Sequence, residues 1–147
     1  MRDDVTQLEF EEFLMSNLPC PCGSDVSFSK CCDGYIRGKR VPETAEALMR
    51  SRYTAYVIGN VPYLLESRHP DFITENEALD IQSWIKDVTS WDKLEILVAE
   101  KGTAKDKLGW VAFNVFFHQG YREESMCEYS RFSRLNGRWV YEEGELG

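Results

Sequence analysis

The sequence predicts an α+β fold in which helices pack on one face of a curled, antiparallel, four-stranded sheet, preceded by a small cysteine-rich knuckle. Two observations support this prediction. The apolar residues repeat at helical spacing up to about residue 88 and at the strand spacing of two after it. Four of the five cysteines lie within the run CPCGSDVSFSKCC. The length of 147 residues corresponds to about one domain.

The predicted helices come first. Residues 44–58 carry an apolar stripe, with Thr44 as the N-cap and Gly59 as the stop signal. A short helix over 61–67 and a turn at 68–71 follow. The pair Thr74 and Glu77 then has the spacing of a capping box, which predicts a third helix extending to about Val88.

The predicted strands follow the helices, over residues 91–100, 109–118, 121–134 and 138–142. Asn136-Gly137 is a strong hairpin signal before the last strand, and the acidic run EEGE at 142–145 is expected to be a solvated end. In the second strand, alternation places one set of side chains toward the core and the other outward. The inward set is Val111, Phe113, Val115 and Phe117; the outward set is Trp110, Ala112, Asn114, Phe116 and His118.

Composition and net charge limit the classes of function that this chain can have. Hydrophobic residues make up 43% and charged residues 29%, as in ordinary globular domains. A net charge of −8 argues against a general nucleic-acid-binding surface, although a local basic patch remains compatible with it. No apolar run approaches the length of a membrane span, and the acidic N-terminus does not resemble a signal peptide. We therefore expect a cytoplasmic protein with reduced cysteines.

The clustered cysteines Cys20, Cys22, Cys31 and Cys32 are predicted to hold one structural zinc ion. The first two would come from one tight turn, and the loop 23–30 would return the chain to the second two. Disulfides, free thiols and an iron–sulfur centre are the alternatives, and a reducing compartment disfavours disulfides. Four protein ligands leave no open position for a substrate. Lys30 and Arg37 are expected to offset the negative charge of the centre.

The run C-P-C-G-S followed by K-C-C resembles the SEC-C zinc motif known from the tail of the preprotein translocase ATPase. The stretches GKRV at 38–41, LMRSRYTAYV at 48–57, HP at 69–70 and SRF…NGRWVY at 130–141 resemble the YchJ-like family. This resemblance covers about residues 18–144. It implies a SEC-C motif joined to a cystatin-like, nuclear-transport-factor-2-like domain. Relatives often have an aromatic residue where this chain has Arg68, and many carry a second SEC-C motif that these 147 residues lack.

These patterns divide the chain into an N-terminal helical segment (1–17), a SEC-C zinc-binding motif (18–40) and a nuclear-transport-factor-2-like domain (43–147). Residues 20–42 have a charge of +2, from four basic and two acidic side chains, whereas the stretches before and after are net negative. We therefore expect the knuckle to bind a partner through its basic and aromatic residues, which are Lys30, Tyr35, Arg37, Lys39 and Arg40.

Two functional hypotheses follow. The first is a zinc-binding adaptor or protein-interaction module whose knuckle docks an acidic protein, with RNA phosphates as a weaker alternative. The second is a small-molecule-binding domain or enzyme that uses the cone-shaped cavity of the fold, with His69 or Glu66 as its polar group. No catalytic motif is visible, and the apolar inner face favours the first hypothesis.

Several single residues carry narrower expectations. Arg50 is expected to be solvated, and Arg52 to pair with a carboxylate such as Glu66 or to form an anion-binding lip. His69 is interpreted as a structural corner, and His118 as a solvated strand end. Cys127 is expected to be a small buried residue.

The outward aromatics Trp110 and Phe116 predict a homodimer or partner contact. The alternative is that the N-terminal segment covers them, through the apolar residues Leu8, Phe10, Phe13 and Leu14.

Overall fold

The computed structural model describes residues 16–147 and confirms the predicted α+β architecture. The knuckle contains a 3-10 turn, η1 (Phe28–Lys30), and the short helix α2 (Cys32–Ile36). The remaining elements, in chain order, are α3 (Ala45–Ile58), α4 (Val61–Glu66), η2 (Pro70–Phe72), α5 (Glu77–Asp87), β1 (Ser90–Lys101), β2 (Leu108–Gln119), β3 (Arg122–Leu135) and β4 (Arg138–Leu146). The helical segment predicted over 1–17, with its covering residues, lies almost wholly outside the described residues.

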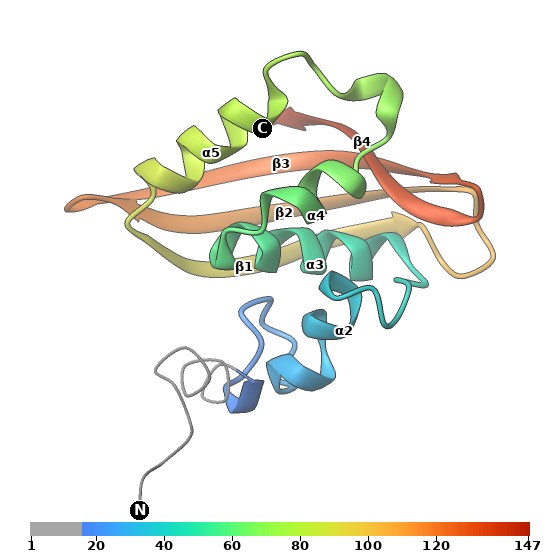
Figure 1. Ribbon diagram of the computed structural model, residues 1–147, viewed down its shortest axis with the longest axis horizontal. Helices are drawn as coiled ribbons and strands as arrows, with labels where there is room; N and C mark the ends of the chain where they lie inside the picture. Colours follow the sequence, from blue (N-terminus) through green and yellow to red (C-terminus); the bar gives the residue numbers. More distant parts are fainter. Residues whose placement is uncertain (1–15) are drawn as a thin grey trace, which may run out of the picture.

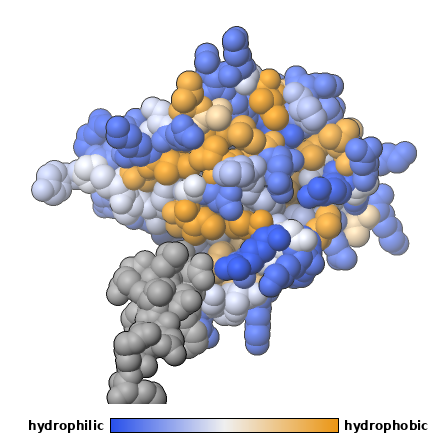
Figure 2. Space-filling model, viewed as in Figure 1, coloured by the Kyte–Doolittle hydropathy of each residue, from blue (hydrophilic) through white to orange (hydrophobic). Residues whose placement is uncertain are grey.

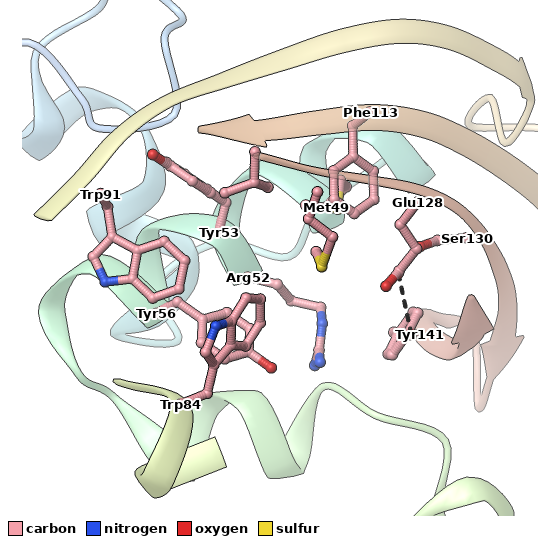
Figure 3. A pocket seen from close by; sticks show the side chains of 12 residues that line it. Met49, Arg52, Tyr53, Tyr56, Trp84, Trp91, Phe113, Glu128, Ser130 and Tyr141 are labelled. Carbon is pink, nitrogen blue, oxygen red and sulfur yellow. Dashed lines mark hydrogen bonds between the residues drawn. The ribbon is translucent and has the colours of Figure 1, made fainter. Parts of the chain in front are cut away.

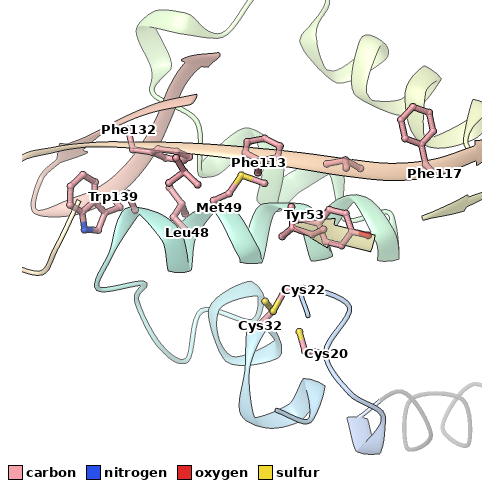
Figure 4. Close-up of a cluster of buried hydrophobic side chains, with 14 of the residues drawn as sticks. Cys20, Cys22, Cys32, Leu48, Met49, Tyr53, Phe113, Phe117, Phe132 and Trp139 are labelled. Carbon is pink, nitrogen blue, oxygen red and sulfur yellow. The ribbon is translucent and has the colours of Figure 1, made fainter. Parts of the chain in front are cut away.

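The molecule is built in layers (Figure 1). The sheet has the order β1-β2-β3-β4 with every neighbouring pair antiparallel. Helices α3, α4 and α5 cover one face, and α3 lies between the sheet and the knuckle (Figure 4). Irregularities of register in β1 and β4 bend the strands, which curls the sheet around the helices. Among residues 16–147, no helix is long and apolar enough to cross a membrane.

The core lies between α3 and the sheet. Leu48, Met49 and Tyr53 of α3 face buried side chains of the sheet, among them Phe113, Phe132 and Trp139 (Figure 4). The alternation predicted for β2 is confirmed, because Val111, Phe113, Val115 and Phe117 are all buried. Trp110 and Phe116 point to the opposite face and are half-buried there.

The first residue of α3 is attached to the β1–β2 loop through a close backbone approach. The Ala45 N–H donates to the Gly102 carbonyl at 2.9 Å. A Cβ on Gly109 would lie 2.5 Å from the Gly102 Cα, and Gly102 itself has a φ of +69°. Glycine at both positions therefore allows the helix start and the two strands to meet.

The third predicted helix begins later than its sequence pattern indicates. Helix α5 starts at Glu77 rather than near Thr74, with Asn76 as its N-cap residue. The Glu77 carboxylate reaches back and accepts a hydrogen bond from the Thr74 N–H at 3.1 Å, so half of the capping box forms. The same carboxylate is only 6% exposed and pairs with Arg68 Nη1 at 2.6 Å.

The acidic C-terminal run was expected to be a solvated end; Glu143 and Glu145 are exposed as expected, but Glu142 is buried and the run belongs to a strand. Strand β4 continues to Leu146, because residues 143–146 pair with β3 beyond an irregularity next to Arg131. Glu142 is buried and forms an ion pair with Arg131, whose Nε lies 3.1 Å from its carboxylate. The carboxylates that follow it line an edge strand, where charge discourages pairing with another chain.

Candidate metal centre and neighbouring pocket

The four clustered cysteines meet on the side of α3 that faces away from the sheet (Figure 4). Their sulfur atoms all lie within 4.8 Å of one another, and Cys20, Cys22 and Cys32 are buried. The turn that holds the first two closes with a hydrogen bond from the Gly23 N–H to the Cys20 carbonyl at 3.1 Å. The loop 23–30 then returns the chain, as predicted, to Cys31 and Cys32 at the start of α2.

The geometry of these sulfurs fits a tetrahedral metal ion. Zinc–sulfur bonds of about 2.3 Å place neighbouring sulfurs roughly 3.8 Å apart, and the Cys22 and Cys31 sulfurs lie 3.7 Å apart. All four cysteines are free thiols in the structure. The Ser24 hydroxyl lies 3.1 Å from the Cys31 sulfur, and the Thr54 hydroxyl lies 3.7 Å from the Cys20 sulfur. Both hydroxyls can donate to thiolates and lower their effective charge.

The thiols are electrostatically unequal. Hydrogen bonds from Cys20 and then Cys32 hold the pKa of the Cys22 thiol far below its usual range. Contacts with Cys20 and Cys22, followed by burial, raise the pKa of Cys32. A cation bound among the sulfurs would draw the protons from these thiols.

Two arginines that were not predicted to support the centre hold carbonyls of the knuckle. Arg50 Nη1 donates to the Cys22 carbonyl at 2.5 Å, and Arg40 Nη2 donates to the Cys31 carbonyl at 2.5 Å. Arg37 instead forms an ion pair with Asp33 at 2.7 Å. The expectation of a solvated Arg50 is wrong, because α3 is covered on both sides and this residue faces the knuckle rather than water.

The five residues predicted to bind a partner differ in their exposure and contacts. Lys30, Arg37 and Lys39 are exposed. Tyr35 is half-buried, and the Arg40 guanidinium stacks over its ring at 4.3 Å. The exposed surface of the knuckle also includes apolar side chains that sequence reasoning had not singled out, which are Leu18, Val26 and Val41.

A cavity lies on the other side of α3, between this helix, α5 and the inner face of the sheet (Figure 3). It has a volume of about 70 Å³. A wider hollow of about 290 Å³ adjoins it and shares four lining residues with it, namely Arg52, Tyr56, Trp84 and Tyr141. Figure 2 shows hydrophobic side chains gathered along the middle of the helix-bearing face. The inner face is thus mostly apolar, as predicted, but it is incompletely filled.

Arg52 is a buried cation at the boundary of these two spaces. It is 6% exposed, and its Nη1 donates to the Leu64 carbonyl at 2.7 Å and to Ser67 Oγ at 2.6 Å. The predicted pairing with Glu66 is wrong, because Glu66 is exposed and lines a different cavity. The guanidinium turns inward to the end of α4, where helix carbonyls lack intrahelical partners.

Glu128 faces the same inner cavity, and sequence reasoning missed it. Its carboxylate accepts hydrogen bonds from the Tyr141 hydroxyl, at 3.3 Å, and from the Ser130 hydroxyl. Strand register could have revealed it, because Glu128 is directly opposite Phe113, and residues opposite one another share a face of the sheet.

The remaining candidates lie away from this cavity. His69 accepts a hydrogen bond at Nδ1 from the Asp71 N–H at 3.1 Å, consistent with a structural corner. His118 is half-exposed at a strand end, with Asp92 Oδ2 2.5 Å from its Nδ1. Cys127 is half-buried rather than buried, because it lies on the outer face of the sheet. Neither histidine supplies the polar group of the cavity.

Comparisons with known proteins agree with this architecture. The family described as "YchJ, middle NTF2-like domain" matches residues 44–144. A UPF0225 protein of Streptomyces coelicolor is 43% identical over 132 residues, covering 90% of this chain and 98% of the relative. A UPF0225 protein of Photorhabdus laumondii is 42% identical over 128 residues, covering 85% and 79%.

Two solved structures are also similar. The solution structure of a SEC-C motif containing protein from Rhodopseudomonas palustris has a TM-score of 0.77 and 31% identity, covering 87% of this chain and 98% of that one. The crystal structure of a SEC-C motif containing protein from Psychrobacter arcticus has a TM-score of 0.73 and 23% identity, covering 91% and 85%. The second likeness, at this identity, concerns the fold alone.

Proposed function

This chain belongs to the YchJ-like family, and from that premise we propose that it is a zinc-stabilised interaction module whose cysteine knuckle docks an acidic protein partner. The observation that carries the proposal is the anchoring of the knuckle. Three of its cysteines are buried in the same hydrophobic cluster as Leu48 and Tyr53 of α3. A loop held in this way presents its outer side chains in a fixed arrangement, which lowers the entropic cost of binding.

Zinc is the metal we propose for Cys20, Cys22, Cys31 and Cys32. Four thiolates form a soft donor set, and a closed tetrahedral site is typical of structural zinc. The role is structural because every coordination position would be taken by the protein. The chemistry requires reduced thiols, which supports a cytoplasmic location. Elemental analysis of protein purified without chelator should find about one zinc per chain, and metal-free protein would contradict the proposal.

The docking surface we propose combines exposed cations with exposed apolar side chains. Arg40 and Arg50 bind knuckle carbonyls, and Lys30, Arg37, Lys39 and Arg40 are exposed at the surface. Leu18 and Val26 add apolar area beside them. Cations around an apolar centre suit an acidic protein better than RNA, which is bound through many phosphate contacts and requires a more strongly basic surface.

Charge reversal tests this surface. The double variant Lys30→Glu/Lys39→Glu alters the knuckle, and Lys105→Glu/Lys107→Glu makes the same change in net charge on the exposed β1–β2 loop. Affinity capture with mass spectrometry should recover one acidic protein with wild type and with the loop variant, but not with the knuckle variant. Recovery of the same protein by all three, or loss of the interaction after ribonuclease treatment, would contradict the proposal.

A further inference from the structure

Arg52 is a buried charge whose partners are all neutral, at a site separate from the proposed docking surface. Its hydrogen bonds go to a carbonyl and a hydroxyl, and the Tyr141 ring centroid lies 4.6 Å from its guanidinium carbon. Among residues 16–147 no carboxylate lies within ion-pair distance of it, whereas the partly buried Arg68 forms an ion pair with Glu77. Burial lowers the pKa of Arg52. A buried charge is costly without an opposite charge, so an anion would stabilise this site.

The orientation of the guanidinium leaves one edge available. Both hydrogen bonds of Arg52 use Nη1, and within the described part of the chain Nε and Nη2 have no hydrogen-bond acceptor. These two nitrogens form the side of the guanidinium that binds a carboxylate through two parallel hydrogen bonds. The contacts with Leu64, Ser67 and Tyr141 fix the plane of the group, so a ligand would meet a preorganised donor pair.

The surroundings of this edge are mainly aromatic. Tyr56 and Trp84 are in edge contact, with ring centroids 5.1 Å apart, and Trp91 lies 5.2 Å from Trp84 (Figure 3). The two spaces are lined by three carboxylates, which are Glu128, Glu77 and Asp80. Glu77 is paired with Arg68, but Glu128 and Asp80 add negative charge to the lining, so the site repels a dianion and an anion gains only through direct contact with Arg52.

We propose that the hollow beside α3 binds a small aromatic monocarboxylate, with the carboxylate held by Nε and Nη2 of Arg52 and the ring against Trp84 and Tyr56. The volumes of the two spaces determine where the ring of such a ligand can fit. The inner cavity of about 70 Å³ is smaller than the cavities of about 150 Å³ that hold benzene. The ring therefore lies in the outer hollow of about 290 Å³, with the carboxylate at the Arg52 edge.

Binding can be measured with defined probes on the full chain. Benzoate is compared with benzamide, which has a similar shape but no charge, with inorganic phosphate and with octanoate. The readouts are tryptophan fluorescence and the indole N–H signals of Trp84 and Trp91. Benzoate should bind about tenfold more tightly than benzamide, because charge-assisted hydrogen bonds are about twice as strong as neutral ones. Equal affinities, tighter binding of phosphate or octanoate, or no binding of benzoate would overturn the proposal.

Two variants separate the proposed contact from general damage. Arg52→Gln should abolish the preference for benzoate, and circular dichroism checks that the variant is folded. Thr74→Phe changes an exposed residue at the rim of the outer hollow, so it should weaken benzoate binding without touching Arg52. Leu79→Phe is the matched control, because Leu79 is exposed on α5 outside the lining. Unchanged benzoate binding in a folded Arg52→Gln protein would place the ligand elsewhere.

Discussion

Removing the metal from the cysteine knuckle should loosen the knuckle while the nuclear-transport-factor-2-like domain stays folded. The knuckle could instead be an integral part of the core, because its buried side chains belong to the same hydrophobic cluster as those of α3. The packing between α3 and the sheet does not depend on the sulfurs, however, since Leu48 and Met49 face Phe113 and Phe132 on the opposite side of the helix (Figure 4). Chelation is therefore expected to disorder the knuckle and to leave α3 packed on the sheet.

The expected magnitude follows from the contacts that would be lost. Phe28 is 5% exposed, and burying a phenylalanine contributes about 1.5–3 kcal/mol. The hydrogen bond from Arg50 to the Cys22 carbonyl involves a charged donor and contributes about 1.5–3 kcal/mol. Their loss amounts to about 3–6 kcal/mol, which in a protein of this size lowers the melting temperature by roughly 10–20 °C.

Calorimetry and heteronuclear spectra with and without chelator, under reducing conditions, measure both parts of the prediction. Cys22→Ser should reproduce the effect of the chelator and then be insensitive to it. Cys127→Ser, which lies on the outer face of the sheet, should behave like wild type. An unchanged melting temperature would refute a metal-stabilised knuckle. Loss of all dispersed methyl signals after chelation would refute the independence of the sheet domain.

Four further predictions concern the metal, the helix junction and the outer sheet face. Zinc binding to thiolates releases protons, so the affinity measured by competition with a chromophoric chelator should fall as the pH drops below neutral, and a pH-independent affinity would exclude thiolate ligands. Arg50→Met should weaken zinc binding by about tenfold or more, whereas the exposed Lys86→Met should not. Glu77→Gln removes the buried partner of Arg68 and should cost about 3–5 kcal/mol in the free energy of unfolding, measured by urea denaturation. If the outer face mediates a homodimer, Trp110→Glu/Phe116→Glu should sediment as a monomer; a wild-type protein that is already monomeric at high concentration would contradict the dimer.

The sequence alone was sufficient for features that depend on neighbours along the chain. The change from helical to strand spacing near residue 88 is a local pattern, and it placed the boundary between the helices and the sheet correctly. Asn136-Gly137 predicted the last hairpin because few residue pairs adopt that turn easily. The cysteine spacing brought four sulfurs together because turns and short loops limit where the chain can go.

The sequence alone did not reveal which partner each charged residue contacts. Arg50, Arg52 and Arg68 lie within 19 positions, yet they contact a knuckle carbonyl, the end of α4 and the start of α5. Helical spacing indicates which side chains share a face, but α3 is buried on two sides and its arginines serve different layers. Glu128 was hidden for a similar reason, since only the pairing of β3 with β2 turns it inward.

By itself the sequence determined the α+β class, the order of the elements and the cysteine cluster, because spacing, turn residues and alternation act over a few residues. Only the tertiary structure decided that the acidic tail extends the sheet, that Arg40 and Arg50 bind the knuckle, and that Arg52, beside an aromatic hollow, has no acidic partner among residues 16–147. A charge interacts with whatever the fold brings within a few ångströms, and in this chain those partners come from segments that are distant in the sequence.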